Sequence, residues 1–242
     1  MADAIWDFLA RRDGVRREAR ETWTKIRPAQ FLPLARTGVF DAMASPGVGA
    51  ALDEVFGSGG WRRPKRWGQP LVTFPAADRA WDVPHASWHL DLDGQIAPGQ
   101  PTDYLRVFAL LADLEPGGGG TAYVSGSHRL TIDWARRRGG GPVRSAEARE
   151  RLEREHPWFA ALCSADDHPD RTRRFMDEDA TIDCVPVRVC EMVGEAGDVI
   201  LMHPATLHTI APNRREVPRM TLVQGIAAAA LPVASAGPKL RS

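Results

Sequence analysis

The chain has 242 residues, 43% of them hydrophobic, and 31 basic against 31 acidic side chains, the composition of a globular protein with a sizeable core. This zero net charge offers no basic surface to nucleic acid, and no apolar run is long enough to span a bilayer. The start lacks a signal-peptide pattern and the three cysteines argue against a disulfide framework, so we expect one cytoplasmic domain, residues 1–242, with reduced thiols.

Residues 1 to about 60 form a helical N-terminal part. Trp6, Leu9 and Val15 recur at spacings that a helix can use, among charged residues that would face solvent. A second helix is expected from about Gly47 to Phe56, because the glycine-rich stretch 57–60 then ends it. We expect these helices to brace the outside of a sheet.

The stretch 88–94 follows a short predicted strand at 71–75 and carries the first candidate ligands. Alternate residues of an extended chain share a face, so His89 and Asp91 would point the same way. The apolar side chains of Trp88, Leu90 and Leu92 would then face a core. An imidazole and a carboxylate converge in this pattern, although one such pair is weak evidence for a metal.

Two apolar segments come next, at 104–114 and at 121–125. The turn 115–120 between them is rich in glycine, and we expect it to bring the second strand back antiparallel to the first as a hairpin. Arg106 lies on the first of these strands. Hairpins, short strands and ligands far apart in sequence predict a mainly β fold with flanking helices, a jelly roll whose two facing sheets hold a ligand in their mouth.

Residues 131–185 have no strand pattern. The stretch 136–142 is expected to be a linker, and Ser145 to cap a helix that runs toward residue 162. We favour a lid-like insertion over the site, and the alternative is a helical bracket that never touches substrate. As a lid it would offer substrate contacts from five side chains: Trp158, Phe159, Arg173, Arg174 and Phe175.

The third candidate ligand comes far downstream. Alternation predicts a strand at 187–193, and a second apolar strand at 199–202 leads into His203 and His208. Two histidines and one carboxylate that leave open coordination positions are the facial arrangement of non-haem Fe(II) oxygenases. The residues alone leave His203 or His208 open as the second imidazole, and Asp93 as an alternative to Asp91.

Four stretches of the chain together resemble the phytanoyl-CoA dioxygenase family of Fe(II)- and 2-oxoglutarate-dependent oxygenases. They are His89-Leu90-Asp91, the hairpin 119–128 that ends in Ser125-Gly126-Ser127-His128, His203-Pro204 followed by His208, and Arg219, eleven positions after His208. Ser125 replaces the usual proline of the family. The resemblance covers roughly residues 70–228, and order, spacing and residue type agree together.

The resemblance implies a double-stranded β-helix of the cupin-like type with Fe(II), 2-oxoglutarate and O₂ as cofactor and co-substrates. It selects His89, Asp91 and His208 as metal ligands and catalytic residues and Arg219 as the arginine that holds 2-oxoglutarate, with Thr121 and Arg106 as further candidates for that contact. The implied reaction is hydroxylation of an aliphatic carbon, with release of succinate and CO₂. Halogenating relatives replace the carboxylate with a small residue, so the presence of Asp91 favours hydroxylation or another oxidation.

Two other classes of function remain alternatives to this enzyme. One is a metal-dependent hydrolase or isomerase of the cupin type, which would ignore 2-oxoglutarate. The other is a non-catalytic jelly-roll binding protein. The sequence marks no basic groove for the phosphates of coenzyme A, so a small acid or metabolite is the expected substrate. Neither the substrate's identity nor the oligomeric state follows from the sequence.

Overall fold

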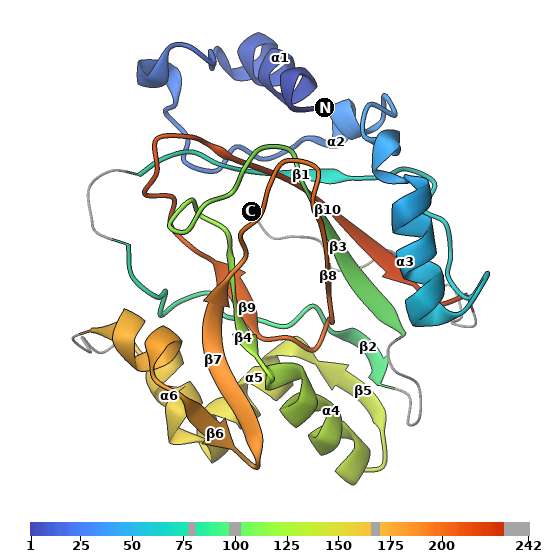
Figure 1. Ribbon diagram of the computed structural model, residues 1–242, viewed down its shortest axis with the longest axis vertical. Coiled ribbons are helices and arrows are strands. Elements are labelled where there is room, and N and C mark those ends of the chain that lie inside the picture. The colour runs from blue at the N-terminus through green and yellow to red at the C-terminus, as the bar shows by residue number, and fades with distance from the viewer. Residues whose placement is uncertain (77–80, 97–102, 166–169, 230–242) are drawn as a thin grey trace.

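Two antiparallel sheets face each other in the computed structural model of the chain (Figure 1). The structure describes residues 1–76, 81–96, 103–165 and 170–229, without the side chains of 93–96. The first sheet has the strand order β1-β10-β3-β8, the second has β6-β7-β4-β9, and a two-stranded ribbon pairs β2 with β5. Strands distant in sequence lie side by side in both sheets, which is a jelly roll, so the expected fold class is confirmed.

All strand pairs are antiparallel. The first sheet contains β1 (Gln69–Thr73), β10 (Arg219–Ala227), β3 (Tyr104–Leu110) and β8 (Val199–Met202). The second contains β6 (Ala180–Ile182), β7 (Val185–Glu191), β4 (Thr121–Ser125) and β9 (His208–Ile210), and the ribbon contains β2 (Asp93–Ile96) and β5 (Gly141–Arg144). Because side chains alternate along a strand, each sheet turns one face inward and one outward.

The expected hairpin between β3 and β4 is wrong, since the two strands belong to different sheets. The connecting turn is bonded to the second sheet and not back to β3. The amide of Met192 donates to the carbonyl of Thr121 (2.9 Å), and the amide of Ala211 donates to that of Gly120 (3.1 Å). A side chain at Gly120 would meet the carbonyl oxygen of Met192 at 2.2 Å, so glycine permits this close crossing.

The N-terminal helices cover the outer face of the first sheet (Figure 1). They are α1 (Ala2–Asp13), η1 (Arg20–Thr22), α2 (Leu32–Ala35), η2 (Asp41–Met43) and α3 (Pro46–Phe56). Ile5, Leu9 and Leu52 are fully buried and share one core with Val107 and Leu222 of the sheet. This confirms the bracing role and the helix expected at 47–56. Between α1 and α3, however, only short helical turns form.

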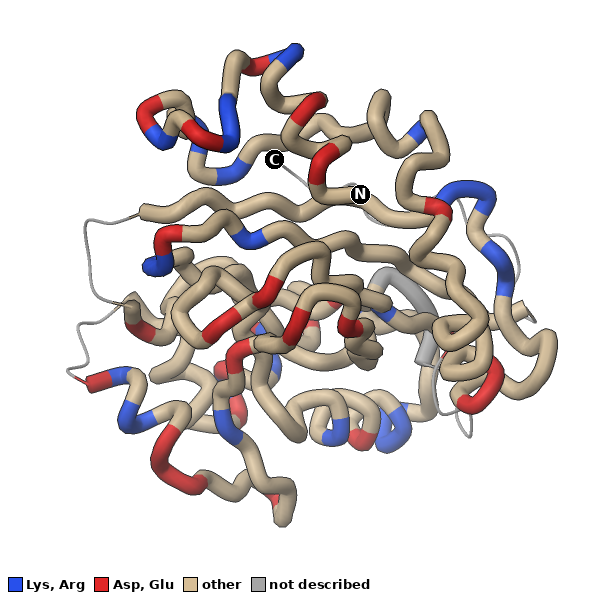
Figure 2. Tube along the Cα trace, turned by 45° about the horizontal axis from the view of Figure 1, so that its top comes forward, with Lys and Arg blue, Asp and Glu red and all other residues tan. Residues whose placement is uncertain are grey.

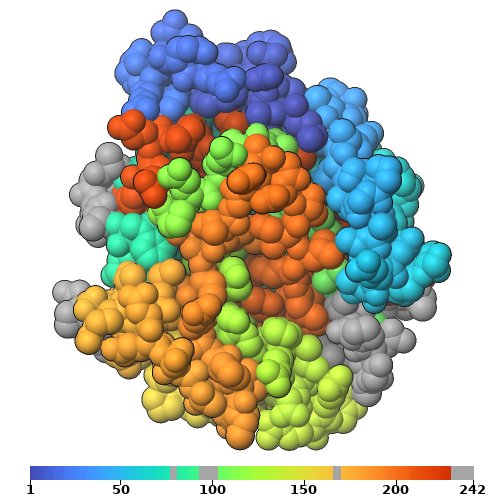
Figure 3. Space-filling model, viewed as in Figure 1, coloured from blue at the N-terminus to red at the C-terminus, as the bar shows by residue number. Residues whose placement is uncertain are grey.

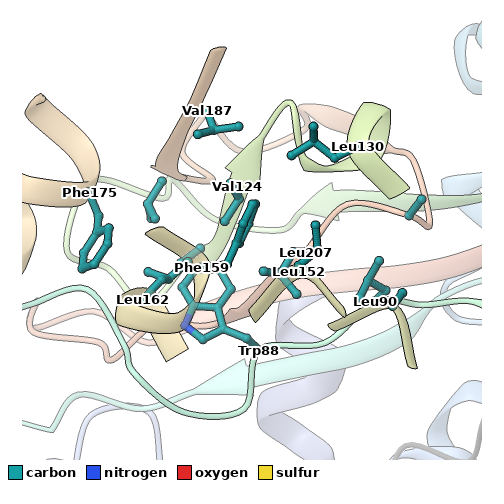
Figure 4. Close-up of a cluster of buried hydrophobic side chains, with 14 of the residues drawn as sticks. Trp88, Leu90, Val124, Leu130, Leu152, Phe159, Leu162, Phe175, Val187 and Leu207 are labelled. Atoms are coloured by element: carbon teal, nitrogen blue, oxygen red, sulfur yellow. The ribbon is translucent and has the colours of Figure 1, made fainter. Parts of the chain in front are cut away.

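The helices between β4 and β7 cover the outer face of the second sheet. They are α4 (Ser127–Arg137), α5 (Ser145–Glu155), α6 (Pro157–Cys163) and the π-helical turn η3 (Arg173–Asp177). Figure 4 shows Trp88, Phe159 and Phe175 in a core with Val124 and Val187 of the sheet. Phe159 and Phe175 have no exposed surface, so they pack as a helical bracket does and are not available as the substrate contacts expected of a lid.

The expected linker at 136–142 and the cap at Ser145 are also corrected. Residues 136 and 137 belong to α4, and the segment that follows forms β5 against β2. Arg144 is the N-cap of α5, and Ser145 is its first helical residue. The hydroxyl of Ser145 instead accepts a hydrogen bond from the amide of Leu90 (2.9 Å), so it anchors the segment that carries His89 and Asp91.

Charged residues lie mainly on the helices and connections, and the strands are mostly uncharged (Figure 2). Among the charged side chains on or beside the two sheets, those of Asp91, Arg106, Glu191 and Arg219 are buried or half-buried. Within the described ranges, no helix has the length and apolar character needed to cross a bilayer.

Candidate metal centre

The segment from Trp88 to Leu92 presents the two faces that its sequence predicts. Trp88, Leu90 and Leu92 are buried in the core of the second sheet, and the alternate residues His89 and Asp91 point away from that core. The segment is extended, as expected, but is not part of a regular strand. His89 makes an isolated bridge with His208, with reciprocal amide-to-carbonyl bonds of 2.9 Å, and the regular strand β2 begins only afterwards.

His208, the first residue of β9, completes a group of three. One ligand atom from each of His89, Asp91 and His208 lies within 4.8 Å of the others, and the two imidazole ring centres are 4.3 Å apart. Within the part of the chain that the structure describes, no other cluster of histidine, cysteine and acidic side chains converges in this way. His203 is outside the group, and the side chain of Asp93 lies outside the described residues.

Backbone carbonyls fix the tautomer of both histidines. Nδ1 of His89 is 2.9 Å from the carbonyl oxygen of Ser87, and Nδ1 of His208 is 2.9 Å from that of Thr206. A carbonyl oxygen only accepts, so each Nδ1 carries the proton and each Nε2 presents a lone pair. Metal-binding histidines in proteins are oriented by this kind of outer hydrogen bond.

Burial keeps His208 neutral. Its side chain is removed from solvent, which lowers the pKa of His208 to about 4, although the neighbouring Asp91 carboxylate acts in the opposite direction. Nε2 of His208 lies 3.5 Å from Oδ2 of Asp91. An imidazole that is neutral at physiological pH is ready to bind a metal ion without first losing a proton.

Arg106 holds the carboxylate of the group. Its Nε donates to Oδ2 of Asp91 at 2.6 Å, and both side chains are almost buried. Burial would raise the pKa of Asp91, but His208 and Arg106 together outweigh it, so the pKa lies below its ordinary value. The sequence suggested Arg106 as a further contact for 2-oxoglutarate, and the structure shows its Nε bonded to Asp91, a candidate metal ligand.

Arg219 is a second buried cation on the inner face of the first sheet. It begins β10, is 2% exposed, and donates from Nε to Thr221 Oγ1 (3.1 Å), from Nη1 to the carbonyl of Gly119 (3.1 Å) and from Nη2 to Thr121 Oγ1 (3.0 Å). Burial lowers the pKa of Arg219 to about 10, with the positive charge of Arg27 acting in the same direction. Thr121, expected near 2-oxoglutarate, therefore orients this guanidinium.

Strand register places Arg219 close to the three candidate ligands. On β4, Tyr123 pairs with His208, and Thr121 lies two residues further along the same face. Two residues of a strand span roughly 6.6 Å, so Thr121 lies about that far along β4 from Tyr123, the residue paired with His208. The guanidinium of Arg219, which is bonded to Thr121, is therefore about one two-residue strand step from the histidines.

The remaining wall of the site is largely apolar. One row of paired residues crosses the neighbouring strands and consists of Cys190, Tyr123, His208 and His89. Tyr123 also packs in an apolar cluster that includes Phe108. Figure 3 shows the molecular surface hollowed between β7 and β8 on the face toward the viewer. The arrangement thus places the three candidate metal ligands near this apolar cluster, with the cationic side chains of Arg106 and Arg219 close by.

Two further expectations concern histidines. His128, from the motif that resembles the family's Pro-Gly-Ser-His, packs its ring against His203 with 5.5 Å between ring centres, and neither joins the ligand group. Sequence reasoning missed Thr221 and Arg27 as neighbours of Arg219. Alternation along β10 could have identified Thr221, two positions after Arg219, but no local pattern marks Arg27.

Comparison with known proteins gives only distant structural similarity. No protein-family model and no curated protein matches the chain. Among solved structures, the α-ketoglutarate-dependent epimerase SnoN from nogalamycin biosynthesis, with Fe³⁺, α-ketoglutarate and nogalamycin RO, is 17% identical, with a TM-score of 0.46 over 98% of this chain and 84% of SnoN. EvdO2 from Micromonospora carbonacea var. aurantiaca is 15% identical, with a TM-score of 0.46 over 98% of this chain and 86% of EvdO2.

HygX from Streptomyces hygroscopicus, with nickel, 2-oxoglutarate and hygromycin B bound, is 17% identical, with a TM-score of 0.43 over 79% of this chain and 66% of HygX. EvdMO1, SnoK and AviO1 are longer, and this chain covers 32%, 50% and 63% of them. All of these TM-scores lie below 0.5, so the roles of the residues rest on the geometry of this chain alone.

Proposed function

We propose that this protein is an Fe(II)- and 2-oxoglutarate-dependent oxygenase, of the kind found in the phytanoyl-CoA dioxygenase family, that oxidises an aliphatic carbon of a small molecule. One observation carries the proposal: a group of two histidines and one aspartate lies about one strand step from a buried arginine that is oriented by two threonine hydroxyls. Neither half of this arrangement is specific by itself, whereas together they match a metal-chelated diacid.

The donor set fits ferrous iron. Two imidazoles with preset Nε2 lone pairs and one carboxylate are three ligands of the type that non-haem Fe(II) sites use, and they leave other coordination positions open. Oxygen and nitrogen ligands without thiolate also separate this group from structural zinc sites, which are closed and often rich in cysteine.

The surroundings of Arg219 fit the far carboxylate of 2-oxoglutarate. A guanidinium binds a carboxylate through two parallel hydrogen bonds, and three acceptors already fix the plane of this one. Thr121 and Thr221 provide hydroxyl groups beside it that can also donate to a carboxylate oxygen. A five-carbon diacid has the length to reach from there to the histidine row.

The chain's own residues then have distinct roles. Ser87 and Thr206 hold the imidazoles through their carbonyls, and Arg106 holds the carboxylate of Asp91, so the three ligands need little reorganisation on binding. Iron and 2-oxoglutarate, once bound by these residues, would activate O₂ for the oxidation of an unactivated C–H bond, with one oxygen atom going to succinate as CO₂ is released and the other to the substrate. The apolar wall around Tyr123 excludes water from that reaction.

Turnover of 2-oxoglutarate tests the proposal. Metal-free protein supplied with Fe(II) in air should convert 2-oxoglutarate to succinate, and His89→Ala, Asp91→Ala and His208→Ala should each reduce the rate at least 100-fold. His85→Ala is the matched control, because this exposed histidine lies outside the ligand group, and it should keep the wild-type rate.

The same experiment separates the alternatives. A cupin-type hydrolase or isomerase would bind metal through the same three residues but would neither bind nor consume 2-oxoglutarate, and Arg219→Ala would leave its metal affinity and activity intact. A non-catalytic binding protein would bind no Fe(II) at this group. Either result would overturn the oxygenase proposal.

A further inference from the structure

A second arginine from outside the sheets, Arg27, lies near Arg219. Arg27 lies in the connection between η1 and α2, which runs beside β1 (Figure 1). The carbonyl of Ile26 accepts a hydrogen bond from the amide of Phe74 (2.8 Å), and the residue before Phe74, Thr73, pairs with Arg219 in the sheet. Arg27 is thus next in sequence to Ile26, whose backbone is bonded to Phe74. Thr73, the neighbour of Phe74, lies opposite Arg219, so the backbones of Arg27 and Arg219 are close in space.

Contacts on both sides of Arg27 hold its backbone in place. Before it, the Trp23 ring packs on Phe74 with 5.0 Å between ring centres. After it, Pro28 is buried, and Nη1 of Arg12 donates to the carbonyl of Ala29 at 2.7 Å. The backbone of Arg27 is therefore fixed, and only its side chain has to change conformation when a ligand binds. An arginine on a freely solvated turn would have to order its backbone as well.

The charges around the two arginines are not balanced by a bonded carboxylate. Among the described residues, Arg27 has no side-chain hydrogen bond or ion pair, and the three acceptors of Arg219 are all neutral. The nearby acid is Glu191, whose Oε2 accepts from the amide of Gly117 at 2.7 Å. Burial, the largest influence, raises the pKa of Glu191 above its usual value, which weakens it further as a counter-ion.

Two guanidinium groups that face each other repel, and an anion between them removes that repulsion. The positive charge of Arg27 already acts on Arg219, where it contributes to the lowered pKa of that side chain. Arg27 keeps part of its surface open to solvent while Arg219 is buried, so an incoming anion can contact both. Each of the two oxygens of a carboxylate accepts more than one hydrogen bond, so a carboxylate bound to Arg219 can still accept from Arg27.

We propose that Arg27 and Arg219 together form a clamp for the far carboxylate of a dicarboxylic acid, and that Arg27 makes the site select diacids over monoacids. The proposal rests on the proposed function, in which this diacid is 2-oxoglutarate. It also gives the N-terminal part of the chain a direct role in co-substrate binding, besides its role as a brace for the first sheet.

Calorimetric titration of the Mn(II)-loaded protein tests the clamp without requiring turnover. The probes are 2-oxoglutarate and 2-oxopentanoate, which has the same five carbons but no far carboxylate. Arg27→Gln should weaken 2-oxoglutarate binding about tenfold, since one partly exposed charge-assisted hydrogen bond is lost, and should leave 2-oxopentanoate binding unchanged. Arg36→Gln, an exposed arginine of the same N-terminal part, is the charge-matched control and should bind both acids as the wild type does.

A second readout concerns the protein without ligands. If the two guanidinium groups repel, Arg27→Gln should melt at the same temperature as Arg36→Gln or higher, while its gain in melting temperature on adding 2-oxoglutarate should be smaller. Wild-type protein that binds 2-oxoglutarate as tightly as Arg27→Gln would overturn the clamp alone. Wild-type protein that binds no 2-oxoglutarate would overturn the proposed function and the clamp together.

Discussion

The ion pair between Arg106 and Asp91 should be one of the strongest pairwise interactions in the metal-free protein. The two side chains are each 11% exposed and their charged atoms are 2.6 Å apart. Removing one partner of a buried pair costs about 3 to 5 kcal/mol, because the other charge is left without compensation. We expect the lower end, about 3 kcal/mol, for Asp91→Asn, since Arg106 also lies over the ring of Tyr104, 5.3 Å from its centre.

A double-mutant cycle isolates the pair. The single variants Asp91→Asn and Arg106→Met and the double variant would be unfolded with urea at pH 7 in the presence of a chelator, with tryptophan fluorescence and circular dichroism as probes. The double variant should lose about 2 kcal/mol less stability than the sum of the two single losses, the size expected of a short charge-assisted hydrogen bond.

The exposed pair Arg137–Asp133 provides the control. Its charged atoms are also 2.6 Å apart, but the side chains are 60% and 62% exposed, so its coupling should stay within about 0.5 kcal/mol. If the cycle on Arg106 and Asp91 also gives less than about 0.5 kcal/mol, then the carboxylate is not held by Arg106, and the argument for preset ligands fails at that residue.

Three further predictions concern Asp91, His208 and the buried Phe159. Because the pKa of Asp91 is lowered by its partners, its contribution to the free energy of unfolding should be present above its ordinary pKa near 4 and lost as pH falls below it. Urea titrations from pH 3 to 7 should therefore show a smaller loss of stability below pH 4 in Asp91→Asn than in the wild type. His208 takes up its proton only near pH 4 when folded but near 6.5 when unfolded, so it should destabilise the protein as pH falls from 6.5 to 4. For the same reason His208 should release no proton when Co(II) binds above pH 5, and calorimetry in buffers of different ionisation enthalpy would detect such a release. Phe159→Ala should cost about 3 to 5 kcal/mol in urea unfolding, against less than about 0.5 kcal/mol for Val217→Ala at an exposed position.

Local alternation was sufficient to predict the two faces of the segment from Trp88 to Leu92. His89 and Asp91 share a face because they are two residues apart in an extended chain, and Trp88 and Leu90 are apolar because the other face is the core. That argument needs no knowledge of the rest of the fold. It did not predict that the segment would be held by a single bridge, since the number of backbone hydrogen bonds depends on where β9 lies.

Partners far apart in sequence were beyond such patterns. Nothing near Arg106 in the sequence indicates a pairing with Asp91. The local sequence predicted a helix cap at Ser145, because its contact with Leu90 joins residues 55 positions apart. The turn before β4 was read as a hairpin because glycine marks a change of direction without saying toward which sheet the chain turns. These features depend on long-range packing, which a single sequence encodes only in the sum of many residues.

The two buried arginines differ in whether the protein supplies a counter-charge, and this difference connects the fold to the proposed chemistry. Arg106 is neutralised within the protein by Asp91, whereas Arg219 is held by neutral oxygens and lies near the positive charge of Arg27. A metal ion bound at the histidines would add positive charge to this interior. The free-energy cost of leaving the charge of Arg219 without an anion would then increase. A diacid that chelates the metal at one end and meets the two arginines at the other compensates both charges at once. Metal and diacid should therefore each strengthen the binding of the other, because each completes a charge balance that the protein alone leaves open.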